Sequence, residues 1–314
     1  MSGSDAGLGF AADYDAPIPY LQRICDYYQG LGYGAPYRWA HYSGVPFQPL
    51  AKPLAECRVA LITTAAPYQP DKGEQGPGAS YNAAAKFYQV YSGDAAIDHD
   101  LRISHVAYDR EHTTAEDSNT WFPLRQLRHM AASGRIGAVT RRFHGAPTNR
   151  SQRTTLDQDC PELLAPRCRA DGADAAVLVP NCPVCHQTPC LAARHLEMNG
   201  IATIVMGCAK DIVEHVGVPR FLFSDFPLGN AAGRPNDPDS QAFTLGLALR
   251  VLESAPASRN SVQSPLRWSE DQSWKLDYCN IERLSTEELQ RRRQEFDRQK
   301  EIAKNIREEP EAGR

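Results

Sequence analysis

Residues 174–190 have the sequence Asp-Ala-Ala-Val-Leu-Val-Pro-Asn-Cys-Pro-Val-Cys-His-Gln-Thr-Pro-Cys. The part from 175 to 180 is apolar throughout and has β-branched valines at its centre, as expected for a strand covered on both faces of a parallel sheet. Thiol-bearing residues follow at once, beginning with Cys182. The stretch therefore predicts a buried strand that ends in a thiol motif.

Neighbouring short apolar runs predict the other strands of the sheet: residues 58–64, 101–105, 201–206 and 220–224, with a weaker candidate at 136–140. Helical patterns lie between them. One covers 189–199 and ends at Gly200, and another covers 209–216 and ends at Gly217, as glycine often terminates helices. This order indicates an α/β fold, a doubly wound and mainly parallel sheet with helices on both faces. A further helix is expected over 237–255.

The chain is expected to have three parts: an irregular N-terminal segment over 1–56 that packs on the core, an α/β domain over 57–255, and a linker with a charged C-terminal helix over 256–314. The N-terminal segment is rich in Tyr and Pro, with one short helix near 18–28. Ser285 and Glu288 have the spacing of a capping box at the start of the last helix. A thin apolar stripe on that helix predicts a surface that docks on the core or on a partner.

The composition, with 42% hydrophobic residues, 23% charged residues and a formal net charge of −4, is that of an ordinary globular protein. Without a basic stripe, neither nucleic acid nor an anionic membrane surface is expected as a partner. The N-terminus lacks a basic region followed by an apolar run, and no stretch approaches the roughly 18 apolar residues of a spanning helix. The sequence therefore predicts a soluble, cytoplasmic protein.

Nine cysteines in such a chain are expected to be reduced, so a cysteine cluster indicates a metal site or catalysis rather than a crosslink. Cys182 and Cys185 form the clearest cluster. A thiol near the start of a helix lies in the positive field of that helix, which favours the thiolate. The Cys-x-x-Cys spacing lets one thiol attack an adduct formed at the other, and His186 next to them can stabilise a thiolate.

Two other interpretations of this pair stay open. A Cys-x-x-Cys motif can be half of a zinc site, which needs a second pair of ligands. Cys160 and Cys168 are spaced too widely for that pair, and no second Cys-x-x-Cys exists, so no metal ligand is assigned. The two thiols can also be inert buried residues.

Residues at other strand ends are further candidates for the site. Thr63 and Thr64 follow the first strand, His105 the predicted second, and Cys208 the strand at 201–206. The carboxyl ends of the strands in a doubly wound sheet meet at one crevice. His105 is the best acid–base candidate, because histidine titrates near neutral pH.

Six motifs occur in an order that is found in a known family: Lys52-Pro-Leu54, Val59-Ala-Leu-Ile-Thr-Thr64, Asp100-Leu-Arg-Ile-Ser-His105, Trp121-Phe-Pro-Leu124, Pro180-Asn-Cys-Pro-Val-Cys-His-Gln187 and Phe226-Pro-Leu-Gly-Asn230. Over roughly residues 45–255 the chain resembles the selenoprotein B family of glycine, sarcosine, betaine and D-proline reductases. The C-terminal helix lies outside this resemblance.

The resemblance implies reductive cleavage of a carbon–nitrogen bond by a selenocysteine that is paired with a cysteine. By position, Cys182 stands where the family has selenocysteine, Cys185 is its resolving partner, and His105 belongs to a histidine-bearing loop. The resemblance further implies no cofactor within this chain, an external dithiol or small redox protein as electron donor, and a pyruvoyl-bearing partner subunit that can activate an amine. No pyruvoyl-forming segment is present in the sequence, so the substrate is not inherited from the family.

We therefore expect a thiol-dependent reductase or lyase that cleaves a C–N or C–S type bond of a small polar substrate, with Cys182, Cys185 and His105 as catalytic residues. The expected substrate-binding residues are Thr63, Thr64, His186, Cys208 and Asn230. A homo-oligomer is also expected. Two alternatives stay open: a cofactor-independent racemase or isomerase with Cys182 and Cys208 as facing acid and base, and a metal-binding or regulatory module held by Cys182, Cys185 and a histidine.

Overall fold

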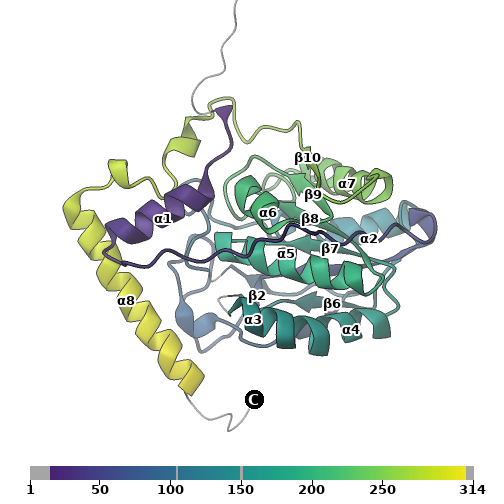
Figure 1. The fold of residues 1–314 in the computed structure, drawn as a ribbon, viewed down its shortest axis with the longest axis horizontal. Helices are drawn as coiled ribbons and strands as arrows, with labels where there is room; N and C mark the ends of the chain where they lie inside the picture. The colour runs from purple at the N-terminus through teal and green to yellow at the C-terminus, as the bar shows by residue number, and fades with distance from the viewer. Residues whose placement is uncertain (1–14, 104, 149–150, 309–314) are drawn as a thin grey trace, which may run out of the picture.

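A computed structural model describes residues 15–103, 105–148 and 151–308, so the first part of the expected N-terminal segment lies outside the described residues. The centre of the molecule is a mainly parallel sheet (Figure 1). In spatial order its strands are β10 (Asn260–Gln263), β9 (Arg220–Phe223), β8 (Ala202–Gly207), β7 (Ala175–Val179), β1 (Arg58–Thr63), β6 (Arg142–Gly145) and β3 (Tyr91–Asp94). The short β5 (Ala138–Val139) pairs with the start of β1, and β3 is antiparallel to β6. The predicted α/β fold is confirmed.

The strand order creates a switch point at β1. β6 lies on one side of β1 and β7 on the other, so the connections that follow β1 and β6 carry the chain in opposite directions. In the register between the two central strands, Thr63 is the partner of Val179. Open parallel sheets bind ligands outside the carboxyl ends of their strands at such points. The fold thus brings the residues that follow β1 and β7 to one place.

Helices cover both faces of the sheet, and the strand residues alternate between two cores. On one face, Val177 and Val179 pack in a cluster with residues of α2 (Leu124–Ala132) and α7 (Pro238–Ser254). On the other face, Ala176 and Leu178 pack with the helical stretch α3 (Gln152–Thr154), η5 (Thr155–Leu164) and α4 (Ala165–Ala170), and with α5 (Pro183–Met198) and α6 (Lys210–Val216). Burial on both faces explains why β7 is apolar along its whole length.

The predicted strands at 58–64, 175–180, 201–206 and 220–224 and the helix at 237–255 are confirmed. The strand predicted over 101–105 is wrong in extent and place. It forms only β4 (Leu101–Arg102), which pairs antiparallel with β2 (Ala66–Pro67) outside the main sheet.

Two other expectations are corrected by the structure. The linker expected after residue 255 contains β10, a parallel edge strand on β9. The helix expected over 189–199 begins at Pro183, because proline suits the first turn of a helix, where its missing N–H has no helical partner in any case.

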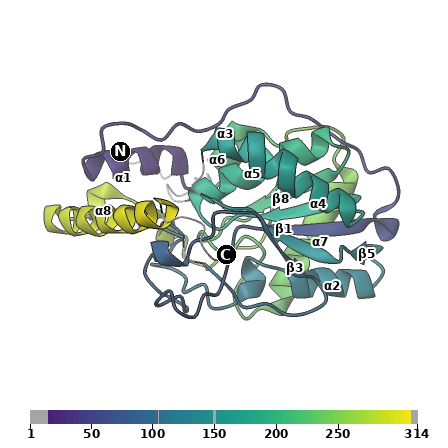
Figure 2. The same cartoon turned by 90° about the horizontal axis from the view of Figure 1, so that it is seen from below.

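The first and last helices, α1 (Tyr20–Gly30) and α8 (Thr286–Glu308), lie side by side at one end of the molecule (Figures 1 and 2). α1 packs against α8, where the Phe296 ring lies 5.4 Å from that of Tyr28 and 5.5 Å from that of Tyr33. The last helix is therefore docked on the chain itself. Its predicted cap is confirmed, since the Glu288 N–H donates to Ser285 Oγ over 3.2 Å.

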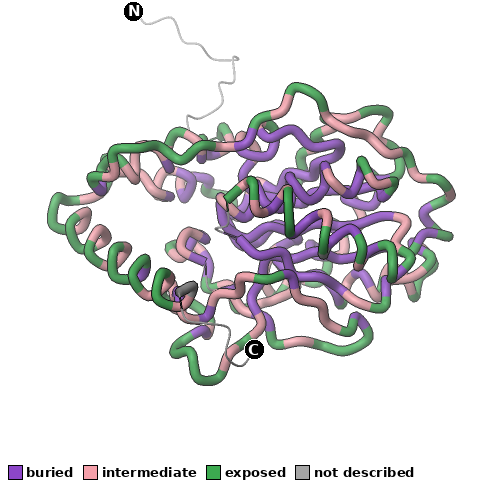
Figure 3. Tube along the Cα trace, turned by 60° about the horizontal axis from the view of Figure 1, so that its bottom comes forward, coloured by how far each residue is buried: buried purple, intermediate pink, exposed green. Residues whose placement is uncertain are grey.

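Short helical turns complete the fold: η2 (Leu54–Glu56), η3 (Ala83–Ala85), η4 (Ser118–Thr120), η6 (Ser273–Leu276) and η7 (Ile281–Arg283). Burial is concentrated in the sheet and its flanking helices, whereas α8 is mostly exposed or half-buried (Figure 3). Within the described ranges, no helix has the length and apolarity needed to cross a membrane.

Candidate active site

The centre of the site is the first turn of α5. Cys182 is the N-cap residue of this helix, and its sulfur accepts a hydrogen bond from the backbone N–H of Cys185 over 3.3 Å. Pro183 occupies the first helical position. The side chain of an N-cap residue normally accepts from the third N–H of the helix, so the Cys-x-x-Cys spacing itself places the second cysteine at the donor. Both thiols are buried.

The two thiols have opposite acidities. Burial raises the pKa of the Cys182 thiol, and its hydrogen bond to the Cys185 side chain raises it further. Burial acts in the same direction on Cys185, but the hydrogen bond with Cys182 and the neighbouring His105 imidazole outweigh it and hold the pKa of Cys185 well below its ordinary value. Cys185 is therefore the more acidic thiol of the pair, and Cys182 the less acidic one.

His105 reaches the thiol pair from a loop that follows β4, not from a strand of the main sheet. The residue is buried, and its Nδ1 atom has no hydrogen-bond partner among the described residues. Its backbone carbonyl accepts a hydrogen bond from Arg110 Nη2 over 2.6 Å. The guanidinium of Arg110 in turn lies over the ring of Tyr108, 4.0 Å from the ring centroid. The loop thus presents an imidazole whose second nitrogen is available.

Two other buried polar side chains at the ends of β1 and β7 have unused hydrogen-bonding groups. Thr64 Oγ1 and both polar atoms of the Asn181 amide have no partner among the described residues, although both residues are fully buried. Thr63 differs, since its hydroxyl oxygen accepts from the N–H of Ala65 over 3.1 Å. Buried polar groups without partners are rare and call for an explanation, such as a bound ligand or water.

Asn181 was not among the residues expected from the sequence. Its position directly between the strand and Cys182 is the signal that could have identified it. Its complete burial, which makes the unused amide informative, is set by tertiary packing.

His186 has a different surrounding from that expected of a substrate ligand. Its Nδ1 donates to the carbonyl of Cys182 over 2.8 Å, and Nε2 accepts from the N–H groups of Cys208 (3.0 Å) and Ala209 (3.2 Å). Burial lowers the pKa of this imidazole to about 4, so it is neutral at neutral pH. His186 therefore joins the start of α5 to the end of β8, and both of its ring nitrogens are engaged in doing so.

Cys208 and Asn230 belong to a neighbouring turn. The Cys208 thiol donates to the carbonyl of Pro227 over 3.8 Å, and Asn230 Nδ2 donates to the same carbonyl over 3.1 Å. Asn230 Oδ1 is buried without a partner in the described part of the chain. Burial raises the pKa of Cys208. The Cys208 thiol thus donates to a backbone carbonyl, whereas the Cys182 sulfur accepts a backbone N–H.

A small cavity borders the thiol site. It is lined by Ala66, Lys86, Phe87, His105 and Thr148 and has a volume of 10 Å³. One water molecule needs roughly 10–15 Å³ by this measure, so the site is closed to anything larger. Lys86, whose positive charge lowers the pKa of Cys182, and Thr148 were also missed from the sequence. Neither lies in a pattern that marks a site.

Across residues 15–103, 105–148 and 151–308, no group of three or more His, Cys, Asp or Glu side chains is placed to hold a metal ion. The fold and the site define an α/β protein with a buried pair of thiols and a histidine at the carboxyl edge of its sheet. The chain belongs to the glycine/sarcosine/betaine reductase selenoprotein B family, whose sequence pattern matches residues 22–180. The thiol pair itself lies just beyond that match.

The chain is also similar to the D-proline reductase subunit gamma of Acetoanaerobium sticklandii. The two are 28% identical over 221 residues, which cover 70% of this chain and 88% of the relative. No solved structure matches the chain. Membership of the family supports a reductase-type role, as the resemblance had implied.

Proposed function

We propose that the chain is a thiol-dependent reductase or lyase that cleaves a C–N or C–S type bond of a small polar substrate. Cys182 is its nucleophile, Cys185 the resolving thiol and His105 the acid–base group. The observation that carries the proposal is the pair at the start of α5, where one sulfur accepts the N–H of the other cysteine and His105 contacts the second thiol.

The first step forms a thioether. The Cys185 thiolate removes the proton from Cys182, and the Cys182 sulfur attacks an activated carbon of the substrate. The bond from this carbon to the amine or thiol leaving group breaks, and the leaving group takes the bonding electron pair and a proton from His105. A paired thiol and an acid–base residue in contact are what such nucleophilic catalysis needs.

The second step breaks the thioether. His105, which is neutral after protonating the leaving group, removes the proton that Cys185 took from Cys182. The Cys185 thiolate then attacks the Cys182 sulfur, the sulfur–carbon bond breaks, and the carbon keeps its electron pair and takes the proton from His105. The substrate carbon is thereby reduced by two electrons, and the two cysteines are oxidised to a disulfide. A dithiol compound or small dithiol protein then reduces this disulfide by thiol–disulfide exchange.

The unused polar groups around the thiols support a polar substrate. Thr64 Oγ1, the Asn181 amide and His105 Nδ1 are buried donors and acceptors that a substrate can satisfy. A bound polar substrate would form hydrogen bonds with these groups and so offset the free-energy cost of burying them unpaired.

The proposal extends to partners and location. The relative in A. sticklandii is named as a subunit, so we infer that this chain also works in a complex of several subunits. One of these would be the pyruvoyl-bearing subunit that activates an amine, and copies of the chain itself would be another component. No cofactor is proposed within the chain, and a cytoplasmic location suits its reduced thiols.

Mild oxidation of the purified protein followed by alkylation and peptide mass mapping tests the thiol pair. We expect a Cys182–Cys185 disulfide to form before any other and to be reversed by a dithiol. Cys160 and Cys168, both buried, are the internal comparison, since burial raises the pKa of each to about 12. A first disulfide between other cysteines would overturn the resolving role of Cys185.

A Cys185→Ala variant tests the chemistry once a substrate is known. Attack by Cys182 should still occur, but the adduct should not be resolved, so intact-protein mass spectrometry should show a covalent adduct after one partial turnover. A fully active Cys185→Ala protein without an adduct would favour the racemase alternative, in which Cys185 has no role.

A further inference from the structure

The loop that carries His105 is held by few backbone bonds. Residues 105–113 contain no helix or strand, and the Asp109 N–H donates to the carbonyl of Leu228 over 3.0 Å. A cavity of 160 Å³ borders Ile103 and Tyr108 at one side of this loop, and the small cavity at the thiols borders His105 at the other. The larger cavity leaves space into which the loop can move if its side-chain contacts are released.

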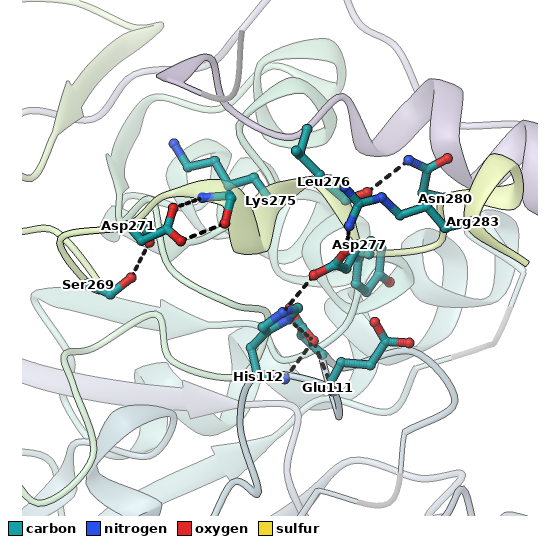
Figure 4. Close-up of polar contacts among 12 residues, drawn as sticks. Glu111, His112, Ser269, Asp271, Lys275, Leu276, Asp277, Asn280 and Arg283 are labelled. Carbon is teal, nitrogen blue, oxygen red and sulfur yellow. Dashed lines mark hydrogen bonds and ion pairs between the residues drawn. The ribbon is translucent and has the colours of Figure 1, made fainter. Parts of the chain in front are cut away.

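His112 contacts two carboxylates, one in the loop and one in a distant segment (Figure 4). Its Nδ1 lies 3.0 Å from both carboxylate oxygens of Asp109, and its Nε2 lies 3.2 Å from Oδ2 of Asp277. Asp109 is buried, and one of its oxygens also accepts from the N–H groups of Glu111 (3.1 Å) and His112 (3.2 Å). The imidazole thus connects the His105 loop to a segment far along the chain.

This geometry requires a protonated ring. A neutral imidazole has one N–H donor and one lone pair, so one of the two carboxylates would face a lone pair. An imidazolium has two donors and can satisfy both. Charge-assisted hydrogen bonds of this type are about twice as strong as neutral ones.

The segment on the far side of His112 is itself anchored. Asp277 is paired with Arg283, and Lys275 with Asp225. The Tyr278 hydroxyl donates to the carbonyl of Ala107 in the His105 loop over 2.8 Å.

Residues 273–283 are also joined to α1. Arg23 Nη1 donates to the carbonyls of Lys275 (2.6 Å) and Tyr278 (3.0 Å). These residues therefore form a fixed support behind the loop.

We propose that His112 is a protonation-dependent latch, through which residues 273–283 hold the His105 loop closed over the thiol pair. His112 is a positioning residue in this scheme, because it acts on the site through the loop. The inference rests on the proposed function only in taking His105 as a residue of the site. Because the cavity beside His105 is too small for a substrate, opening of the latch is the step that admits one.

The charged groups around the ring set the direction of its pH response. They are Asp109 and Glu111 of the loop, Asp277 and Arg283 of the C-terminal segment, and Arg292 of α8, which pairs with Glu111. The hydrogen bond to Asp109 raises the pKa of His112 above its usual value, with Asp277 adding to the effect and burial opposing it. The latch is therefore complete below the ordinary histidine pKa and is lost as the pH rises through the raised value.

Hydrogen exchange read by mass spectrometry tests the latch without any substrate. Protection of amides in 105–113, corrected for the intrinsic effect of pH, should fall by about ten- to hundredfold between slightly acid and alkaline pH, as expected for losing hydrogen bonds to a charged group. In His112→Gln, which cannot titrate, protection should be low at both pH values. In Asp277→Asn, the loss of amide protection should occur at lower pH, because one of the carboxylates that raise the pKa of His112 is gone.

Asp271→Asn is the matched control. Asp271 lies on the same part of the chain but accepts from the N–H and hydroxyl of Ser273, both over 2.8 Å, so its variant should behave as the wild type does. Amides of β7 and β8 must stay protected in every variant, which shows that the fold is intact. Loop protection that is independent of pH in the wild type, or unchanged in His112→Gln, would overturn the latch. Failure of the thiol chemistry would leave this exchange pattern in place, so the two proposals fail separately.

Discussion

Cys182 and Cys208 follow neighbouring parallel strands, β7 and β8, and both are buried, yet their surroundings differ. Cys182 caps a sixteen-residue helix, accepts a backbone N–H and is hydrogen-bonded to a second thiol, which contacts a histidine. Cys208 donates to a carbonyl and lies in the apolar cluster that includes Phe226. A position at the end of a strand therefore does not by itself set the surroundings of a thiol. A second ionisable group in contact is what separates these two cysteines.

His186 connects the two strand ends. One ring nitrogen bonds the backbone of Cys182 and the other that of Cys208. The same side chain thus fixes both thiols, and differences between them arise from their other neighbours.

The largest expected difference between Cys182 and Cys208 is in turnover after each thiol is removed. Cys182→Ala should abolish turnover while the fold stays intact, because this side chain contributes little to either core cluster. Cys208→Ala should lower turnover only slightly under the reductase mechanism. Activity with the identified substrate, with circular dichroism as the control for folding, measures both. Loss of activity in both variants would instead favour two facing thiols and a racemase.

His105→Ala tests the histidine that contacts Cys185, the thiol paired with Cys182. If the imidazole handles a proton in the transition state, turnover should fall by roughly 10²–10⁴-fold. His186→Gln is the comparison, because its amide can replace some of the backbone bonds without supplying a titrating group. A His105→Ala protein with near-normal turnover would remove this residue from the mechanism.

Thiolate absorbance against pH sharpens the contrast between the two environments. The pKa of Cys185 is lowered and that of Cys208 raised, so a thiolate should be present at pH values below the ordinary cysteine pKa and should disappear in Cys185→Ser but not in Cys208→Ser. Because the pKa of Cys185 is lower in the folded protein than in the unfolded chain, the thiolate stabilises the fold at pH values above the ordinary cysteine pKa. This stabilisation is lost as the pH falls through the lowered pKa of Cys185. An early thiolate that persists in Cys185→Ser would contradict the assignment.

Removing the connection between the strand ends should have a smaller effect, on stability. In His186→Ala the N–H groups of Cys208 and Ala209 lose their acceptor, at a cost of about 2–4 kcal/mol in the free energy of unfolding. In Gly207→Ala, the added Cβ would lie 2.8 Å from the imidazole, so this variant should also be destabilised. Chemical denaturation measures both changes. His195→Ala, at a half-buried position in the last turn of α5, is the control, and a cost as large there would contradict a special role for His186.

Much of the sheet could be predicted because buried parallel strands have continuous apolar sequences. β1, β7, β8 and β9 are of this kind. β6 was missed because it contains Arg142, which is paired with Asp171 in the folded protein, and His144, whose pKa burial lowers to about 4. β10 was missed because an edge strand of four mostly polar residues has no such pattern, and its partner β9 defines it.

The packing of the N-terminal segment could not be predicted from sequence either. Arginines distant in the chain hold it by its backbone: Arg194 donates to the carbonyl of Gly44 over 2.8 Å, and Arg220 to that of Gln48 over 2.8 Å. Arg220 also forms a buried ion pair with Glu197 at 2.8 Å. Contacts between a side chain and a distant carbonyl leave no periodic pattern in either partner.

The sequence by itself determined the strand over Ala175–Val179 and the spacing that places the N–H of Cys185 on the sulfur of Cys182. These depend on residues only a few positions apart, so local geometry is sufficient to set them. The tertiary structure decided which of the two thiols is the more acidic, that His105 arrives from outside the main sheet, and that the C-terminal segment contacts the loop that carries His105. Proton affinity depends on burial and on neighbours from distant parts of the chain, and only folding brings these together.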